Sequence, residues 1–246
     1  RLPGLTRPVA VFFRLESPVG FDAADGMPVN MVFGLLSPEA LLRAARGSRI
    51  TLRRTNPATG KAELVPATIR SASEQGVVVE LYTSQGCSSC PPADALMADL
   101  AQMPGVIALA LHVDYWDYIG WTDTFGQAKF TDRQKAYAHA AGEKMIYTPQ
   151  MIVGGRARVE GNQPGKVAEA IAAAQGEAHP VTLLAARDDG KLVIRAEALA
   201  PLRGPVSVQV VHYADSAVVD IGRGENAGMS VAYHNIVTSW AKVGEW

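Results

Sequence analysis

The stretch VVVELYTSQGCSSCPPADALMADL, Val77–Leu100, decides the fold of this protein. It begins with a run that is apolar on both faces but for one glutamate, which predicts a buried strand over Val77–Thr83. A short turn follows, and then an apolar stripe at helical spacing predicts a helix over Pro92–Gln102. The only two cysteines of the chain, Cys87 and Cys90, therefore lie at a strand-to-helix junction.

The elements predicted after this stretch alternate between strands and helices. Val106–Val113 is a continuous apolar run, typical of a buried parallel strand, and Thr131–Met145 has a helical apolar face. Residues 150–160 predict a hairpin around a Gly-Gly turn, and Pro164–Gln175 predicts a last helix. The order β-α-β-α-β-β-α, with C-x-x-C at the first strand-to-helix junction, predicts a thioredoxin-like α/β core over residues 75–178.

The cysteine pair predicts redox chemistry. Thr148-Pro149 comes just before the third strand, where thioredoxin-fold proteins carry a cis-proline packed against the cysteines. Cys87 would lie at the amino end of its helix, where unpaired N–H groups and the helix dipole stabilise a thiolate. Because the thiolate attacks a disulfide, we expect Cys87 to be the nucleophile and Cys90 to resolve the mixed disulfide. The backbone edge at Thr148 and Pro149 would pair with a substrate strand.

Two further features bear on this site. Glu80 is a candidate proton-relay carboxylate for Cys90, since thioredoxins often have an acid in this strand, and it is equally a candidate salt-bridge partner. The loop Asp114–Phe130 is long and rich in aromatic residues, Trp116 among them. Loops of this length are usually functional or packed on another part of the protein. The loop is therefore either an aromatic plug against the core or a wall of the substrate groove.

Other roles remain open for the cysteine pair. An inert disulfide is one, although such a bridge closes a very short loop and would stabilise the fold little. Half of a metal site is another, but two thiolates are only half of the four ligands that zinc usually takes. His112 is the nearest candidate for a third ligand, and a structural histidine is the commoner case. Two hypotheses follow: a thiol–disulfide oxidoreductase without cofactor or metal, or a non-catalytic thioredoxin-fold protein that holds a partner or a metal ion.

The rest of the chain divides into two parts. Residues 1–74 predict an irregular α+β appendage with strands over Pro8–Leu15 and Val29–Leu36, a helix that starts at Ser37, and a hairpin or linker over residues 48–74. Residues 179–246 predict a carboxy-terminal antiparallel β-rich module, with strands over Val181–Ala186, Leu192–Ala196, Val206–Tyr213, Ala217–Ile221 and Ser230–Val237.

The bulk composition excludes several classes of partner. The net charge of −1 and pI of about 6.6 give no electrostatic case for nucleic acid or an anionic membrane surface. No run reaches the roughly 18 to 20 apolar residues that a membrane-spanning helix needs. The expected partners are protein or small-molecule thiols and disulfides, and the oligomeric state stays open.

Five stretches of residues 76–246 carry a family resemblance: VVVELYTSQGCSSCPPADALMADLA, HVDYWDYIGWTDTF, FTDRQKAYA, YTPQMIVGG and RGENAGMSVAYHNIV. On these stretches, residues 76–246 resemble a bacterial family of exported thioredoxin-like proteins, domain-of-unknown-function family 1223. The resemblance implies the thioredoxin-like fold, and it supports that fold more than any particular reaction. It also implies export, and hence a periplasmic or secreted location. The chain itself shows no signal peptide, so a cytoplasmic location stays open.

A second resemblance lies in the stretch RLPGLTRPVAVFFRLESPVGFDAADGMPVNMVFGLLSPE, Arg1–Glu39. On this stretch, residues 1–46 resemble a fragment of the nitrogen-type enzyme IIA of the bacterial phosphotransferase system. In that family the phospho-accepting histidine lies just upstream of the segment that matches Arg1, whereas the first histidine of this chain is His112. The resemblance therefore implies a remnant of a phosphotransfer domain or a fusion artefact, not a working phosphotransferase.

Overall fold

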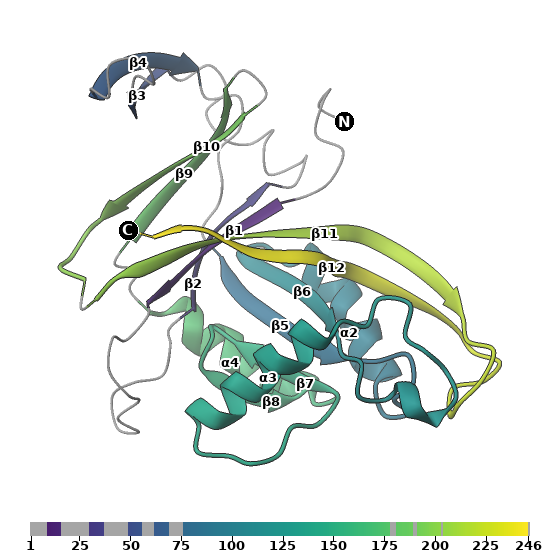
Figure 1. Ribbon diagram of the computed structural model, residues 1–246. Helices are drawn as coiled ribbons and strands as arrows, with labels where there is room; N and C mark the ends of the chain where they lie inside the picture. Colours follow the sequence, from purple (N-terminus) through teal and green to yellow (C-terminus); the bar gives the residue numbers. More distant parts are fainter. Residues whose placement is uncertain are drawn as a thin grey trace.

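The computed structural model describes residues 9–15, 30–36, 49–55, 62–68, 76–177, 181–188, 191–202 and 204–245. Within these ranges the protein is a mixed α/β structure in which helices pack on a central sheet (Figure 1). The helices are α2 (Pro91–Gln102), α3 (Ala128–Ala140), α4 (Pro164–Gln175) and the 3₁₀-helix η1 (Asp117–Ile119). The strands are β1 (Val9–Leu15), β2 (Asn30–Leu36), β3 (Arg49–Thr55), β4 (Ala62–Thr68), β5 (Val77–Thr83), β6 (Val106–His112), β7 (Gln150–Val153), β8 (Ala157–Glu160), β9 (Val181–Asp188), β10 (Lys191–Ala198), β11 (Val206–Asp220) and β12 (Ser230–Glu245).

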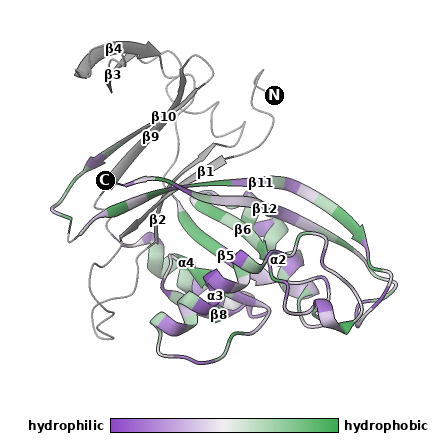
Figure 2. Cartoon of the chain, in the orientation of Figure 1, coloured by the Kyte–Doolittle hydropathy of each residue, from purple (hydrophilic) through white to green (hydrophobic). Residues whose placement is uncertain are grey.

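The central sheet has the strand order β2-β1-β11-β12-β6-β5-β7-β8. Six of these strands, β5 to β8 with β11 and β12, come from residue 77 onward. β5 and β6 are parallel neighbours joined through α2, whereas β7 runs antiparallel to β5 and β8 pairs with β7. Figure 2 shows β5 and β6 as hydrophobic over most of their length, as expected of strands that are covered on both faces.

The two faces of β5 contact different helices because successive side chains of a strand point to opposite sides. Val79 and Leu81 pack in one cluster with residues of α2 and α4. Val78 and Tyr82 pack in a second cluster with residues of α3, β11 and β12. The helices α2 and α4 therefore cover one face of the sheet, and α3 covers the other.

The elements predicted between residues 77 and 175 are confirmed, with one correction. β5 and α4 have the predicted bounds, and β7 and β8 form the hairpin predicted over residues 150–160. α2 and β6 differ from the predicted bounds by a single residue. The predicted helix over Thr131–Met145 is wrong at both ends, since α3 begins at Ala128 and ends at Ala140. The chain leaves the helix through Gly142 in the left-handed region (φ +72°), and Met145 lies beyond it, 77% exposed.

The carboxy-terminal strands differ from the prediction in length and in pairing. The two strands predicted over residues 206–221 form one strand, β11, which pairs with β12 along its length through two bulges. β12 also pairs with β6, where Ile236 lies opposite Ala110, so this hairpin continues the central sheet. β9 and β10 form a separate two-stranded sheet.

The amino-terminal strands lie close to where the sequence predicts them. β1 pairs antiparallel with β11 and β2 pairs with β1, so both strands extend the central sheet. β3 and β4 form an antiparallel hairpin, which agrees with the hairpin expected over residues 48–74. The helix expected from Ser37 lies outside the described residues. The division of the chain into three parts stays a prediction.

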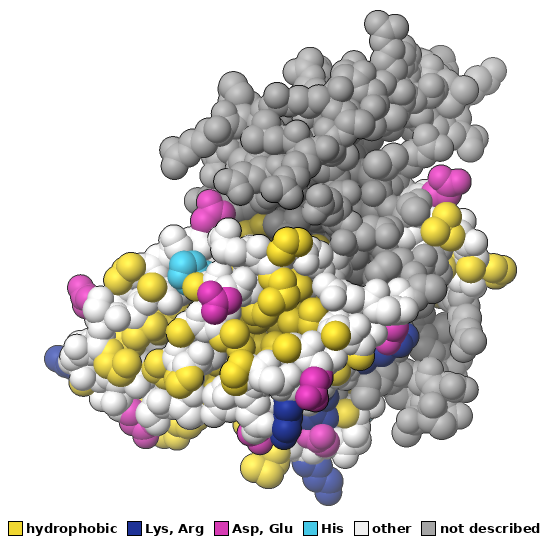
Figure 3. Space-filling model, turned by 180° about the vertical axis from the view of Figure 1, so that it is seen from behind, with side chains coloured by type: hydrophobic (Ala, Val, Ile, Leu, Met, Phe, Trp, Pro, Cys, Tyr) yellow, Lys and Arg dark blue, Asp and Glu magenta, His cyan; other side chains and the backbone are white. Residues whose placement is uncertain are grey.

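The surface of the described part is mixed in character. Figure 3 shows hydrophobic side chains gathered across one face, with positive and negative side chains around them. Large exposed apolar side chains include Tyr118, Met145 and Val218. In the part of the chain that the structure describes, no helix has the length and apolar character needed to cross a membrane.

Candidate functional site

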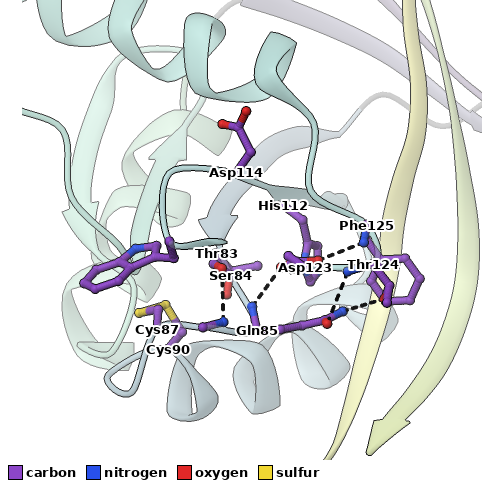
Figure 4. A network of polar contacts seen from close by, with 12 residues as sticks. Thr83, Ser84, Gln85, Cys87, Cys90, His112, Asp114, Asp123, Thr124 and Phe125 are labelled. Atoms are coloured by element: carbon purple, nitrogen blue, oxygen red, sulfur yellow. Dashed lines mark hydrogen bonds and ion pairs between the residues drawn. A yellow bond between two sulfur atoms is a disulfide. The ribbon is translucent and has the colours of Figure 1, made fainter. Parts of the chain in front are cut away.

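The two cysteines form a disulfide in the turn between β5 and α2 (Figure 4). Their Cα atoms lie 5.4 Å apart, and the Cys90 amide donates a hydrogen bond to the Cys87 carbonyl (3.2 Å). Cys90 is the N-cap residue of α2, which begins at Pro91. Both cysteines are completely buried, at 0% exposed. The pair therefore lies at the amino end of a helix, as predicted, but shielded from solvent.

The structure brings the other predicted substrate-binding residues to this turn. The peptide bond between Thr148 and Pro149 is cis. Ser89 Oγ lies 3.4 Å from Cys87 Sγ and donates a hydrogen bond of 3.4 Å to the Thr148 carbonyl. Trp116 Nε1 donates to Thr148 Oγ1 at 2.7 Å. One contiguous group thus contains five of the six predicted site residues, all except Glu80.

The aromatic loop after β6 covers the turn that carries the disulfide. A Cβ added to Gly86 would lie 3.1 Å from Trp116 Cβ and 3.2 Å from Ile119 Cδ1, so the loop packs directly on this glycine. Trp116 stacks on Tyr118 with 6.5 Å between ring centroids, and Tyr118 is 81% exposed. Further along the loop, Phe125 packs into a cluster with residues of β11 and β12. The loop therefore fills space against the core at one end and borders the cysteines at the other.

The tip of the β11–β12 hairpin reaches the same turn. Asn226 Nδ2 donates to the carbonyl oxygens of Gln85 (2.9 Å) and Cys87 (3.0 Å), and its side chain is buried. Trp121 Nε1 donates to Gln85 Oε1 at 2.8 Å. Asn226 was missed from the sequence, where an asparagine in a glycine-rich segment indicates only a turn.

A buried ion pair lies beside the turn. His112 Nδ1 and Asp123 Oδ2 are 2.8 Å apart, and the same oxygen accepts a hydrogen bond from the Gln85 amide (2.8 Å) (Figure 4). Burial raises the pKa of Asp123, but the hydrogen bond and charge of His112, together with the backbone amides of Gln85 and Phe125, hold it below its usual value. Asp123 therefore stays ionised and fixes the orientation of the His112 ring.

A second buried carboxyl, Asp94, lies in the first turn of α2. Thr83 Oγ1 donates to its Oδ1 at 2.8 Å. Burial raises the pKa of Asp94 to about 7, against the opposing effects of His112 and of the Thr83 hydrogen bond. The sequence signal for Asp94 is an acid four residues after Cys90, next to the apolar stripe of the helix. Across the described residues, no three or more His, Cys, Asp or Glu side chains are grouped so as to hold a metal ion.

Glu80 lies apart from the cysteines, on the face of β5 that α3 covers. Its carboxylate makes a two-point ion pair with Arg133 (2.7 and 2.8 Å) and accepts hydrogen bonds from Tyr82 (2.9 Å) and Tyr137 (2.7 Å). Burial raises the pKa of Glu80, but the Arg133 charge and these hydrogen bonds hold it below its usual value. Glu80 is therefore an ionised salt-bridge partner, and the structure does not bring it to Cys90.

Comparison with known proteins gives short matches to curated proteins and longer matches to a solved structure and to a family model. Curated proteins named nitrogen regulatory protein match short segments: 50% identity over 40 residues in Pseudomonas aeruginosa and 43% over 54 residues in Bradyrhizobium diazoefficiens. These segments are 16% and 19% of this chain, and the chain spans only 26% and 35% of those relatives. Like the resemblance described for residues 1–46, these matches cover only a small fragment of each protein.

The longer similarities cover most of the chain. A crystal structure of protein AGR_C_4864 from Agrobacterium tumefaciens is similar, with a TM-score of 0.53 and 29% identity over 71% of this chain and 76% of that one. The family model described as "Protein of unknown function (DUF1223)" matches residues 78–246. That match includes the whole site described above and confirms the resemblance to family 1223, while its description names neither a fold nor a location: the chain belongs to the DUF1223 family.

Proposed function

We propose that this protein is a thiol–disulfide oxidoreductase of thioredoxin-like fold, with Cys87 as the attacking sulfur and Cys90 as the resolving one. The observation that carries the proposal is the Cys87–Cys90 disulfide at the amino end of α2, beside the cis Thr148–Pro149 bond. The strand order β6-β5-β7-β8, with α2 and α4 on one face and α3 on the other, supports the thioredoxin-like fold.

The surroundings of Cys87 suit a thiolate. The helix dipole of α2 favours negative charge at this end, and the Ser89 hydroxyl lies within reach of Cys87 Sγ. In the reduced protein, the Cys87 thiolate attacks one sulfur of a substrate disulfide, and the other substrate sulfur leaves as a thiolate. The Cys90 sulfur then attacks Cys87 Sγ, which restores the disulfide and releases the second substrate thiolate. The same steps in reverse oxidise a substrate dithiol.

The burial of both sulfurs adds a requirement to this chemistry. A substrate can reach Cys87 only after the side chains over it move, and Trp116, held by one hydrogen bond to Thr148, borders the turn. A protein segment or a small molecule that displaces this indole would reach the sulfur. As part of the proposal, such a protein works in the periplasm or outside the cell, where disulfides form and persist.

The experiment compares wild type with Cys87→Ser in insulin-disulfide reduction and in dithiol oxidation. Ser88→Ala is the matched control, because Ser88 is exposed in the same turn. Wild type and Ser88→Ala should exchange disulfides, and Cys87→Ser should fall to the background rate. Equal rates in wild type and Cys87→Ser would overturn the proposal.

The burial of the pair also favours a second function, a non-catalytic thioredoxin-fold binding protein. In that case the reduced cysteines would stay unreactive toward an alkylating agent in the folded protein. The oxidoreductase proposal predicts instead that one cysteine, Cys87, is alkylated first. Mass spectrometry of the reduced, alkylated protein separates the two functions.

A further inference from the structure

Two buried polar atoms beside the disulfide turn have no hydrogen-bond partner among the described residues. They are Oδ2 of Asp94 and Nε2 of His112, on side chains that are 2% and 0% exposed. Buried polar atoms in folded proteins nearly always have a partner, so an unpaired one calls for a physical explanation. Here a carboxyl group and an imidazole ring each present an unpaired atom in the same buried region.

The two side chains are held next to one another by the strands. Thr83 and His112 are directly opposite in the parallel pairing of β5 with β6, so their side chains lie on the same face of the sheet. Thr83 Oγ1 holds Oδ1 of Asp94 at 2.8 Å, which places the carboxyl on that face. Asp123 binds Nδ1 of His112, so Nε2 is the ring nitrogen that has no partner among the described residues.

Asp94 and Cys90 share one face of the helix. The two residues are four apart, and the Asp94 amide donates to the Cys90 carbonyl at 3.1 Å, as in a regular helical turn. Residues four apart lie on one helix face, and side chains of a helix point toward its amino end. Asp94 therefore lies on the helix face that begins at the resolving cysteine.

We propose that Asp94, with the His112–Asp123 pair behind it, exchanges the proton of Cys90 whenever the disulfide opens or closes. The inference rests on the proposed oxidoreductase function. When a substrate thiolate attacks Cys87 Sγ, the S–S bond breaks and its electron pair goes to Cys90 Sγ. The Cys90 thiolate then takes the proton of the Asp94 carboxylic acid. In the reverse step the Cys90 thiol returns the proton to the Asp94 carboxylate before its sulfur attacks Cys87.

The protonation of these groups fits this role. Because burial raises the pKa of Asp94 to about 7, the carboxyl can both give and take a proton near neutral pH, where general acid–base catalysis is most effective. The titratable groups that interact with it are His112 of β6, Asp123 of the loop and Tyr233 of β12. Burial, and then Asp94 and Asp123, raise the pKa of Tyr233, so that phenol stays protonated.

The test follows the reduced protein through one turnover with oxidised glutathione between pH 5 and pH 9. Acid quenching and mass spectrometry measure the formation and the decay of the mixed disulfide. In wild type the decay, which is the attack by Cys90, should show an inflection near pH 7. Asp94→Asn should slow the decay on the order of 10²-fold and abolish the inflection, while formation at Cys87 is unchanged. Asp99→Asn is the matched control, because Asp99 is exposed on the same helix.

A second variant keeps the carboxyl and shifts it. The Thr83 hydrogen bond lowers the pKa of Asp94, so Thr83→Val should move the inflection to higher pH without removing it. The inference is overturned if Asp94→Asn retains the wild-type decay rate and inflection, or if the inflection stays in place in Thr83→Val. If the wild-type protein forms no mixed disulfide at all, the proposed oxidoreductase function is overturned as well. The formation step therefore distinguishes a failure of the proposed function from a failure of the inference about Asp94.

Discussion

Asp94→Asn is expected to make the oxidised protein more stable than wild type, and the gain should grow with pH. The folded protein holds a proton on Asp94 up to about pH 7, whereas an ordinary aspartate releases it near 3.8. Above pH 4 the unfolded chain therefore binds fewer protons than the folded one, so wild-type stability falls as pH rises toward 7. At 1.36 kcal/mol per pKa unit, the full effect is about 4 kcal/mol. About 2.5 to 3 kcal/mol of it develops between pH 5 and pH 8.5.

Urea unfolding of the oxidised protein, followed by tryptophan fluorescence, measures this effect. The unfolding free energies of wild type, Asp94→Asn and the exposed control Asp99→Asn are compared at several values of pH from 5 to 8.5. An unchanged slope of the unfolding free energy against urea concentration shows that the variants expose the same amount of surface on unfolding. A difference between Asp94→Asn and wild type that does not change with pH would refute the reasoning, since it would mean that Asp94 titrates alike in the folded and unfolded states.

Three further substitutions test other contacts of the site. Trp116→Phe keeps an aromatic ring but removes the indole N–H and its hydrogen bond to Thr148, so dithiothreitol should reduce the disulfide about fivefold faster; an unchanged or slower rate contradicts this. Asn226→Ala removes two hydrogen bonds to the cysteine turn, although the Cys87 carbonyl keeps the Cys90 amide as a donor. The variant should lose about 2 kcal/mol of unfolding free energy in urea, whereas wild-type stability would show that those hydrogen bonds contribute nothing. Glu80→Gln leaves the Arg133 charge buried without its counter-ion and should cost about 3 to 5 kcal/mol, yet leave the pH profile of disulfide exchange in place; a shifted profile would make Glu80 a proton relay after all.

The sheet core could be predicted because its sequence signals are local. The apolar runs of β5 and β6 and the glycine pair between β7 and β8 each determine an element within a few residues. The bounds of α3 were missed because its amphipathic pattern continues past Gly142, where only the backbone conformation ends the helix. The single long strand β11 was missed because Asp215 and Ser216 resemble a turn, whereas Ala214 and Ser216 on either side of Asp215 both pair with β12.

The candidate site was predictable only in part, because only some of its residues have a local sequence signal. Cys87, Cys90 and Thr148-Pro149 belong to motifs that a sequence shows directly. The role of Asp94 depends instead on the register of β5 against β6, which places Thr83 beside His112. Contacts of this kind join residues far apart in the chain and leave no periodic signal. The same holds for Asn226, which reaches the cysteine turn from 139 residues away.

Glu80 shows that the face of the sheet on which a side chain lies decides whether it can act at the cysteines. As an acid in the strand before the cysteines, it had the sequence signal of a proton relay. The pleat of β5 turns its side chain toward α3, where Arg133 neutralises it. Asp94, with a weaker sequence signal, lies on the face that α2 covers, and its carboxyl is hydrogen-bonded to Thr83 there.

Whether Cys87 is the attacking sulfur is measured most directly by trapping the mixed disulfide. Cys90→Ser and Cys87→Ser are each reduced, incubated with oxidised glutathione and analysed by intact-mass spectrometry. Cys90→Ser should accumulate one glutathione adduct on Cys87, because the sulfur that would resolve it is gone, and Cys87→Ser should remain almost free of adduct. Equal labelling of the two variants, or an adduct that forms faster on Cys90, would contradict the assignment of Cys87 as the nucleophile.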